Sequence, residues 1–451
     1  MSAVETLPAP SRERYQALLG EAAQIRGISL WKDAWRRLKK NWAAMGSLWF
    51  LCALGLLAFF TPLLPLQSPQ HQISDAEHKY QPPSSEAVTL EYDDRERRRL
   101  EQGIELDKQE LRRVEKEIGE LHRRLDRLPP KPEGTKTAAK KKPATVETAA
   151  EKERGAIEKE KAAKEKEKEA LKGQLEGKWL AHPLNRLWNN PGPLTWQLLK
   201  ARIAVFGKWS VPSLCGRDEL GRDVLARIFW GARVSIIVGL VATLVSLAIG
   251  VSYGAVSGYL GGIVDTVMMR IVDILYSIPF IFIVIFLITI LSEDSIKARL
   301  ARWGIDQIVI FYFVIGAIYW LTMARVVRGQ IISLKHEQFV DAARTIGAGT
   351  PRIVFRHLIP NVLGIVIVYL TLTIPSVMLF EAFLSFLGLG VQPPDVSWGL
   401  LMSEGLKVIT PLEIHWWLVV FPGVALALTL FALNFLGDGL RDALDPRMKN
   451  R

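Results

Sequence analysis

The sequence predicts an all-α integral membrane protein with six transmembrane helices and a helical hairpin inserted after the first of them. Apolar runs close to the ~20 residues that cross a bilayer as a helix occur six times along the chain. Between the first and the second run, a heptad pattern is followed by a stretch rich in Ala, Glu and Lys. This arrangement is typical of two helices that pack together outside the membrane.

The overall charge does not indicate a nucleic-acid partner. The chain has 451 residues, of which 49% are apolar, and a formal net charge of +11. Residues 86–178 hold 25 Lys and Arg against 23 Asp and Glu, so the basic excess lies outside this highly charged stretch. Basic residues spread around apolar runs are typical of a membrane protein, and we expect no nucleic-acid binding.

The first apolar run is expected to remain in the mature protein, because a charged segment of 45 residues precedes it and no small-residue cleavage site follows. Basic residues before this run and after the fourth place both sites in the cytoplasm, by the positive-inside rule. The six runs are Gly46 to Leu66, Val234 to Val256, Ile271 to Leu291, Ile308 to Val327, Val362 to Phe386 and Trp416 to Leu436. Pro279 in the third run and Pro375 in the fifth imply local kinks.

The insert between the first two runs reads as a coiled-coil hairpin. A turn rich in Pro, Gly and Lys is expected at 129–143, and a second helix from about Glu147 to Leu175. Two interpretations stand side by side: a docking arm for another envelope component, or a solvated insert without an essential role. The heptad positions of the first helix, with Asp107 as the one break, are Leu100, Ile104, Leu111, Val114, Ile118, Leu121, Leu125 and Leu128.

Three further features near the membrane lead to specific expectations. The stretch Cys215 to Arg233 has an apolar stripe that indicates an interfacial helix. Arg270 and Asp273, at i and i+3, are expected to pair with each other. Glu381 is a carboxylate inside an apolar run, so it either lines a pathway or hydrogen-bonds a neighbouring helix.

The segment from Asp341 to Asn361 is amphipathic and lies between two apolar runs. We expect two short helices around a glycine break, the first with Phe339, Ala342, Ala343 and Ile346 near one face. Taken alone, this pattern also fits a basic loop at the membrane surface. The break is expected at Gly347 and Gly349, with Thr350 as the N-cap of a second helix that ends at Pro360.

This segment resembles the "EAA" loop of ABC-importer permeases, with Asp341 where the motif has Glu, and with Leu358, Ile359 and Pro360 following. Other stretches are similar to dipeptide and oligopeptide permeases: DELGRD at 218–223, although Cys215 replaces a more usual glycine, the run EAFLSFLGLG from Glu381, and FLGDGLRDALDPRMK from Phe435.

The resemblance implies a type I ABC-importer permease core in a bacterial inner membrane, acting as the C-type subunit of a peptide importer. It further implies a second permease, two cytoplasmic ATP-binding subunits and an extracytoplasmic solute-binding protein as partners. In that family the loop is a coupling helix that docks on the ATPase. The residues that carry this role over are Phe339, Asp341, Ala342, Ala343, Gly347 and Pro360.

The chain lacks a phosphate-binding G-x-x-x-x-G-K-[ST] loop, an H-E-x-x-H motif and a plausible catalytic triad. We therefore expect no enzyme activity, no metal and no cofactor, with ATP bound by partner subunits. Alternatives are a permease for nickel or a sugar, and a membrane-anchored coiled-coil scaffold. A secondary transporter or channel would fit the span count but not the loop motif.

The expected organisation follows from these features. It comprises a cytoplasmic segment at 1–45, a first span at 46–66, a periplasmic insert at 67–209 with its hairpin at about 86–178, a permease core at 210–437 with five spans and the coupling loop 337–360, and a cytoplasmic tail at 438–451.

Overall fold

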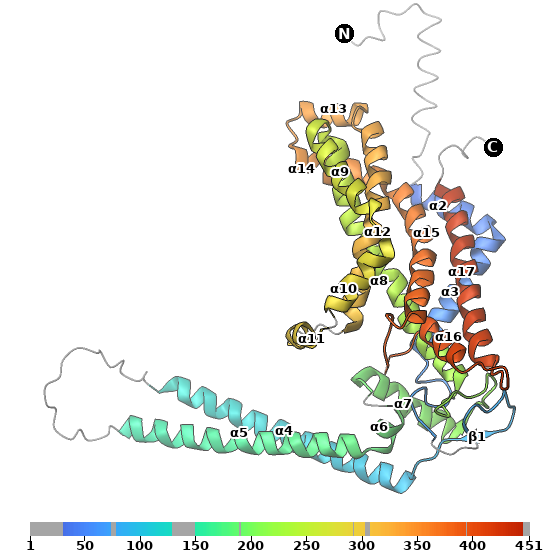
Figure 1. The fold of residues 1–451 in the computed structure, drawn as a ribbon. Helices are drawn as coiled ribbons and strands as arrows, with labels where there is room; N and C mark the ends of the chain where they lie inside the picture. The colour runs from blue at the N-terminus through green and yellow to red at the C-terminus, as the bar shows by residue number, and fades with distance from the viewer. Residues whose placement is uncertain are drawn as a thin grey trace, which may run out of the picture. The chain divides into compact units, whose positions relative to one another are not determined.

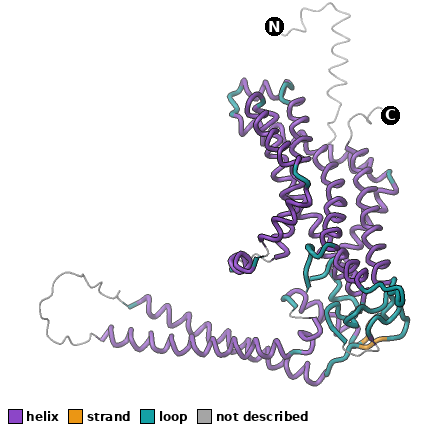
Figure 2. The backbone as a smooth tube through the Cα atoms, viewed as in Figure 1, coloured by secondary structure: helices purple, strands orange, loops and turns teal. Residues whose placement is uncertain are grey.

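The computed structural model describes residues 30–73, 78–128, 149–188, 191–291, 293–302, 307–393 and 395–444. Helices dominate this part of the chain (Figures 1 and 2). The chain forms two compact units: residues 60–227, here the inserted unit, and residues 1–59 with 228–451, here the membrane unit. The expected turn at 129–143, most of the N-terminal segment and the end of the tail lie outside the described residues.

The inserted unit contains the expected pair of long helices, α4 (Asp94–Arg127) and α5 (Ala149–Ala181). Ion pairs join Glu117 to Lys164 and Glu115 to Lys168, each at 2.8 Å. A residue earlier in α4 thus pairs with a residue later in α5, which shows that the two helices run antiparallel. The apolar residues buried between them are Ile104, Val114, Leu121, Ile157 and Leu171.

Asp107, the break in the heptad pattern, is buried on α4. It forms an ion pair with Lys178 of α5, with 2.7 Å between Nζ and Oδ2. A buried carboxylate is costly unless a charged partner lies beside it. This pair therefore favours one register of the two helices over its neighbours.

The base of the inserted unit is built from short elements. These are α6 (Pro183–Trp188), α7 (Pro193–Phe206) and an antiparallel strand pair, β1 (Val88–Thr89) with β2 (Trp209–Ser210). The buried guanidinium of Arg202 donates to the carbonyl oxygens of Leu64 and Leu66, each at 3.0 Å. One side chain thus ties α7 to the segment that enters the unit.

The expected interfacial helix at Cys215 to Arg233 is wrong in its first half. Residues 217–223 form a turn closed by a bridge between Arg217 and Asp223, and the long helix α8 (Val224–Leu260) starts directly after it. The carboxylate of Asp218 accepts the N–H groups of Leu220 and Arg222, each at 2.9 Å. Those bonds favour a turn over a helix in this stretch.

The same turn gathers buried charges. The Asp218 carboxylate accepts hydrogen bonds from the guanidinium groups of Arg222, at 2.7 Å, and Arg227, at 2.5 Å. Asp223 accepts the Ala226 N–H at 2.8 Å and so caps the first turn of α8. Burial raises the pKa of Asp223 to about 6, against the effect of the Ala226 N–H and Arg217. The motif residues at 218–223 therefore have a structural role.

Among its described residues, the membrane unit contains five helices that are long and apolar enough to cross a membrane, or six if one bent pair counts as a single span. The chain is therefore a multi-pass membrane protein. The five are α3 (Trp42–Phe59), α8, α12 (Gln307–Leu334), α15 (Ile359–Phe386) and α17 (Trp417–Leu444), and the bent pair is α9 (Gly262–Ser277) with α10 (Phe280–Leu291).

The kink expected at Pro279 is confirmed, and it divides the run from Ile271 to Leu291 between two helices, α9 and α10, whose axes differ by 85°. Ile278 is extended, with φ −80° and ψ 128°, as the residue before a proline prefers. Pro279 then lacks the N–H that would continue the helix. On the other side of α9, only Gly261 separates this helix from α8.

The first and last spans pack together at the ends of the chain. The helix α17 contacts α3, α15, α16 (Trp398–Lys407) and the short α2 (Leu30–Lys40). Figure 1 shows α2 at the same end of the membrane unit as α13 (Gln338–Thr345). The remaining elements of this unit are α11 (Asp294–Ala301), α14 (Thr350–Arg352) and the π-helical turn η2 (Ile353–Leu358).

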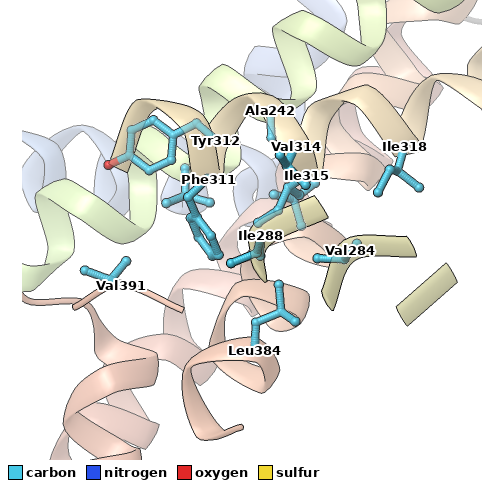
Figure 3. Packing of buried hydrophobic residues seen from close by; sticks show 12 residues of the cluster. Ala242, Val284, Ile288, Phe311, Tyr312, Val314, Ile315, Ile318, Leu384 and Val391 are labelled. Atoms are coloured by element: carbon cyan, nitrogen blue, oxygen red, sulfur yellow. The ribbon is translucent and has the colours of Figure 1, made fainter. Parts of the chain in front are cut away.

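Buried apolar side chains join α8, α10, α12 and α15, as Figure 3 shows for Ala242, Ile288, Ile315 and Leu384. Small residues bring α8 and α12 still closer. A Cβ atom at Gly254 would lie 2.3 Å from the carbonyl oxygen of Ala324, which is nearer than real Cβ atoms come. Backbone approach of this kind is a common way for membrane helices to pack.

Candidate functional site

The segment between α12 and α15 begins with the amphipathic helix α13. One face is buried: Val340 and Ala343 lie in a core with Ile353, Val354 and Leu358 of the following turn. This core continues into α8, α12 and α15, so the helix is fixed to the membrane unit by its own side chains.

The neighbouring face of α13 is open. Phe339, Ala342 and Ile346 are exposed, and the exposed fraction of Ile346 reaches 84%. Phe355 of η2 is exposed as well, at 54%. The sequence placed Ala343 with Phe339 and Ile346 near one face, but in the structure Ala343 belongs to the buried side. Large exposed apolar side chains beside a fixed helix are typical of a docking surface.

The C-terminus of α13 is closed as expected at Gly347, which has φ 83°. The Ala348 N–H donates to the Ala343 carbonyl and the Gly347 N–H to that of Arg344, at 3.0 and 2.9 Å. These two bonds are the Schellman cap, in which a left-handed residue favours glycine. Asp341, the acidic residue of the motif, is exposed and pairs with Arg344 at 3.3 Å.

The second short helix of the expected pair is absent as a separate element. Helix α14, η2 and α15 follow one another without a gap and form one helical stretch from Thr350 to Phe386. Its N-cap is Gly349, one residue before the expected Thr350. Pro360 does not end a helix, because the preceding turn widens to a π-turn, in which the Ile359 N–H donates to the Val354 carbonyl.

Polar contacts hold α8, α9 and α12 together next to α13. The Arg328 guanidinium donates to both oxygens of Asp265, each at 2.6 Å, and the Ser257 hydroxyl also donates to Asp265. Lys335 donates to the Gly258 carbonyl at 3.2 Å. Sequence reasoning missed this network; its only signal was a charged residue near the end of each of two apolar runs.

Arg344 of α13 also contacts α8. Its guanidinium lies 5.5 Å from the centroid of the Tyr259 ring. A hydrogen bond with Tyr259 raises the pKa of Arg344 above its usual value. The amphipathic helix is thereby attached to α8, a span that it does not itself connect.

The expected pair between Arg270 and Asp273 is wrong. Asp273 pairs with Arg325 of α12 at 2.9 Å, and the Arg325 guanidinium also lies 4.3 Å from the centroid of the Tyr276 ring. Arg325 reaches the Asp273 carboxylate from a facing helix. The i, i+3 spacing of Arg270 and Asp273 carries no information about such a partner from another helix.

Glu381 is fully buried and accepts hydrogen bonds from the hydroxyls of Ser385, at 2.8 Å, and Ser397, at 2.7 Å. Ser397 is the N-cap of α16, and its oxygen accepts the Leu400 N–H. For Glu381 the sequence left two alternatives, a pathway residue or a hydrogen bond to a neighbouring helix. These contacts match the second alternative.

A cavity of about 360 Å³ opens at the break between α9 and α10. Its lining combines aromatic and hydroxyl side chains, among them Tyr276, Phe280, Tyr319 and Thr322. In a membrane, an interrupted helix is tolerated where protein or water covers the freed backbone groups. The cavity therefore lies where the helix is interrupted, with residues from both sides of the break in its lining.

Within the described ranges, His, Cys, Asp and Glu side chains form no group that could hold a metal ion. Cys52, which is exposed, and Cys215, which is buried, are both free thiols. Burial raises the pKa of Cys215 to about 11, so this thiol is unreactive at neutral pH.

The geometry defines an α-helical multi-pass membrane protein that presents a short amphipathic helix between two spans. The particular family follows from comparison: residues 221–450 match the model of the binding-protein-dependent transport system inner membrane component, and the chain belongs to this family. Residues 29–83 match the N-terminal transmembrane domain of oligopeptide transport permease C. The hairpin α4–α5 lies between the two matched ranges.

Curated relatives agree with this assignment. The oligopeptide transport system permease protein OppC of Salmonella typhimurium is 53% identical over 232 residues, which are 51% of this chain and 72% of that protein. The dipeptide transport system permease protein DppC of Bacillus subtilis is 45% identical over 234 residues, 52% and 68% of the two chains. A solved MetNI methionine ABC transporter chain, 19% identical with a TM-score of 0.37, covers 49% of this chain and 96% of its own and adds nothing to the assignment.

Proposed function

We propose that this chain is a permease subunit of an ATP-driven importer for dipeptides or oligopeptides. Membership of the permease family, together with relatives named for oligopeptide and dipeptide transport, supports this function. Nickel or a sugar as the solute is the alternative within the same family. The observation that carries the proposal beyond family membership is the fixed amphipathic helix α13 with its exposed apolar face.

The coupling step takes place at α13. In this proposal a cytoplasmic ATP-binding subunit receives Phe339, Ala342 and Ile346 in a groove, while Asp341 contacts its rim. Ala343, Gly347 and Pro360 act by holding the helix in place, because Ala343 is buried, Gly347 forms the cap and Pro360 belongs to the start of α15. Closure of the ATP-binding subunits on ATP then moves α13, and the ion pair Asp265–Arg328 transmits the movement to α9 and α12.

The remaining assembly follows the family pattern. A second permease completes the pathway, two ATP-binding subunits supply energy and an extracytoplasmic solute-binding protein delivers the solute. The chain itself carries no ATP site and needs no cofactor or metal. In this proposal, the cavity at the α9–α10 break forms part of the pathway, because its lining mixes aromatic and hydroxyl side chains. In a bacterial inner membrane both termini are cytoplasmic, and the coiled-coil hairpin of the insert 67–209 is extracytoplasmic.

A membrane-anchored scaffold is the rival class, in which the hairpin is the active part. One span would suffice for anchorage, whereas the described part of this chain has five or six candidate spans. A scaffold also gives no reason for a buried core beneath an amphipathic helix between two spans. The two proposals differ in what should be bound at α13.

The test is co-purification from the native membrane after mild solubilisation, with partners identified by mass spectrometry. We expect an ATP-binding subunit and a second permease with the wild-type chain. The variant Ile346→Glu changes an exposed side chain and should lose the ATP-binding subunit but keep the permease partner. Leu412→Glu, at a side chain that is 95% exposed in the loop before α17, is the matched control and should keep both. Retention of the ATP-binding subunit by Ile346→Glu would refute coupling through α13.

A further inference from the structure

The short N-terminal helix α2 ends at Lys40, and span α3 begins at Trp42. One side of α2 is buried: Ala34 and Leu38 form a small core with Ala443 of α17. A Cβ atom at Gly439 of α17 would lie 2.3 Å from the Ala44 Cβ, so the first turn of α3 lies directly against α17. The orientation of α2 is therefore determined by packing.

The opposite side of α2 is basic and open. Lys32, Arg36, Lys39 and Lys40 are all exposed, and their spacing places them within roughly a third of the helix circumference. Arg37 lies beside this sector and is paired with Asp33 at 2.8 Å. The four exposed cations thus form a sector of one sign, which we call the basic face.

Two aromatic side chains border this basic face. Trp35 is 46% exposed and Lys39 lies 5.5 Å from its ring centroid, while Trp42, at the start of the span, is 87% exposed. Tryptophan side chains concentrate where acyl chains meet headgroups, since one end of the ring system is apolar and the other donates a hydrogen bond. Both residues therefore mark the membrane boundary at α2.

We infer that α2 is an in-plane helix whose basic face binds the headgroups of anionic phospholipids. The span that starts two residues after α2 keeps the helix at the membrane boundary, so lipid headgroups are the nearest polyanion available. Charge complementarity then selects phosphatidylglycerol-like lipids over neutral ones, as for other juxtamembrane basic clusters. Because α2 packs on the last span, a bound lipid also stabilises the contact between both ends of the membrane unit.

The inference is tested with the full-length protein in neutral detergent, by titrating phosphatidylglycerol or phosphatidylcholine and counting bound lipids by native mass spectrometry. The test variant carries Lys32→Gln, Arg36→Gln, Lys39→Gln and Lys40→Gln, which leave the buried side of α2 unchanged. Each basic residue near an anionic surface contributes roughly fivefold to binding. We expect the apparent affinity for phosphatidylglycerol to fall by at least roughly tenfold, with phosphatidylcholine binding unchanged.

The matched control removes four exposed arginines from α4, by Arg98→Gln, Arg99→Gln, Arg123→Gln and Arg124→Gln. It changes the net charge equally and should bind phosphatidylglycerol as the wild type does. An equal loss in both variants would mean that only total charge matters, and the inference would be wrong. Inorganic phosphate should not compete with the lipid; full competition would show a free-anion site in place of a membrane contact.

Hydrogen exchange in nanodiscs provides the local readout. Amides of α2 should exchange more slowly in phosphatidylglycerol-containing nanodiscs than in phosphatidylcholine nanodiscs for the wild type, and equally in both for the test variant. Equal exchange in both lipids for the wild type overturns the inference. So does loss of a co-purified ATP-binding subunit from the test variant without any change in lipid binding, since the basic face would then be a protein contact.

Discussion

At the scale of single residues, Ala342 and Ala343 show how neighbouring positions of one motif can have different roles. Ala342 is exposed and Ala343 is 4% exposed, in contact with the core below α13. A helix turns by about 100° per residue, so adjacent residues differ in environment even when the sequence treats them as one motif.

This difference predicts two distinct phenotypes. Ala343→Arg buries an unpaired charge and should lower the stability of the membrane unit by about 3 kcal/mol, seen as a reduced melting temperature of the solubilised protein. Ala342→Arg should leave the melting temperature within about one degree of the wild type, because surface changes cost little. It should nevertheless lose the ATP-binding subunit in co-purification. Equal melting temperatures for the two variants would contradict the burial of Ala343.

His182 carries the clearest pH dependence. It is fully buried, its Nδ1 accepts the Leu184 N–H at 3.2 Å, and its ring packs edge-on against Trp196 at 4.5 Å. Burial, with smaller effects from Arg97 and Lys200, lowers the pKa of His182 to about 4, below the 6.5 of an unfolded histidine. The folded state therefore holds the neutral ring.

As the pH falls from about 6.5 to about 4, the unfolded state takes up a proton at this histidine first, so the contribution of His182 to the stability of the inserted unit falls by on the order of 2 kcal/mol. The raised pKa of Asp223 acts in the opposite direction. The measurement is hydrogen exchange of the α6 and α7 amides at pH 7 and pH 5, corrected for intrinsic rates. His182→Gln should flatten the difference, whereas His122→Gln, at an exposed position on α4, should not. An unchanged difference in His182→Gln would assign the effect to another group.

At the scale of elements, the contact between α8 and α12 depends on small residues at every fourth position of α8. Added Cβ atoms at Gly250, Gly254 and Gly258 would each meet α12 atoms closer than 3 Å. Helix backbones that approach this closely cannot separate slightly to admit a side chain without losing contacts along their length.

Gly254→Leu is therefore expected to lower the melting temperature and the yield of folded protein, by an amount equivalent to about 3 kcal/mol or more. Gly364→Leu on α15 is the control, because no atom lies within 4 Å of its added Cβ. Thermal unfolding of both solubilised variants makes the comparison. If the melting temperature of Gly254→Leu equals that of the wild type, α8 and α12 do not pack as described.

At the scale of the whole molecule, the hairpin is the part whose sequence lies between the two matched family ranges, 29–83 and 221–450. Its distal contacts are between α4 and α5 themselves, while both helices contact α6 only near the base. The outer part of the hairpin thus adds little to the stability of the rest.

Replacing residues 115–168 by a short Gly/Ser linker should leave the melting temperature of the membrane unit and the co-purified partners unchanged. The pair Asp107–Lys178 remains and closes the shortened hairpin. If uptake of a labelled peptide in cells also persists, the hairpin has no essential role in transport. Loss of uptake with intact partners would instead support the docking-arm interpretation.

The sequence by itself determined the properties that depend on local patterns. Apolar run length set most of the spans, heptad spacing set α4, Gly347 set the end of α13, and motif residues such as Asp341 indicated the family. The tertiary structure decided which partner each polar group has and which face each residue presents: Asp273 with Arg325, Glu381 with Ser397, and Ala343 inward. These depend on side chains far apart along the chain, and local spacing carries no information about how distant helices meet.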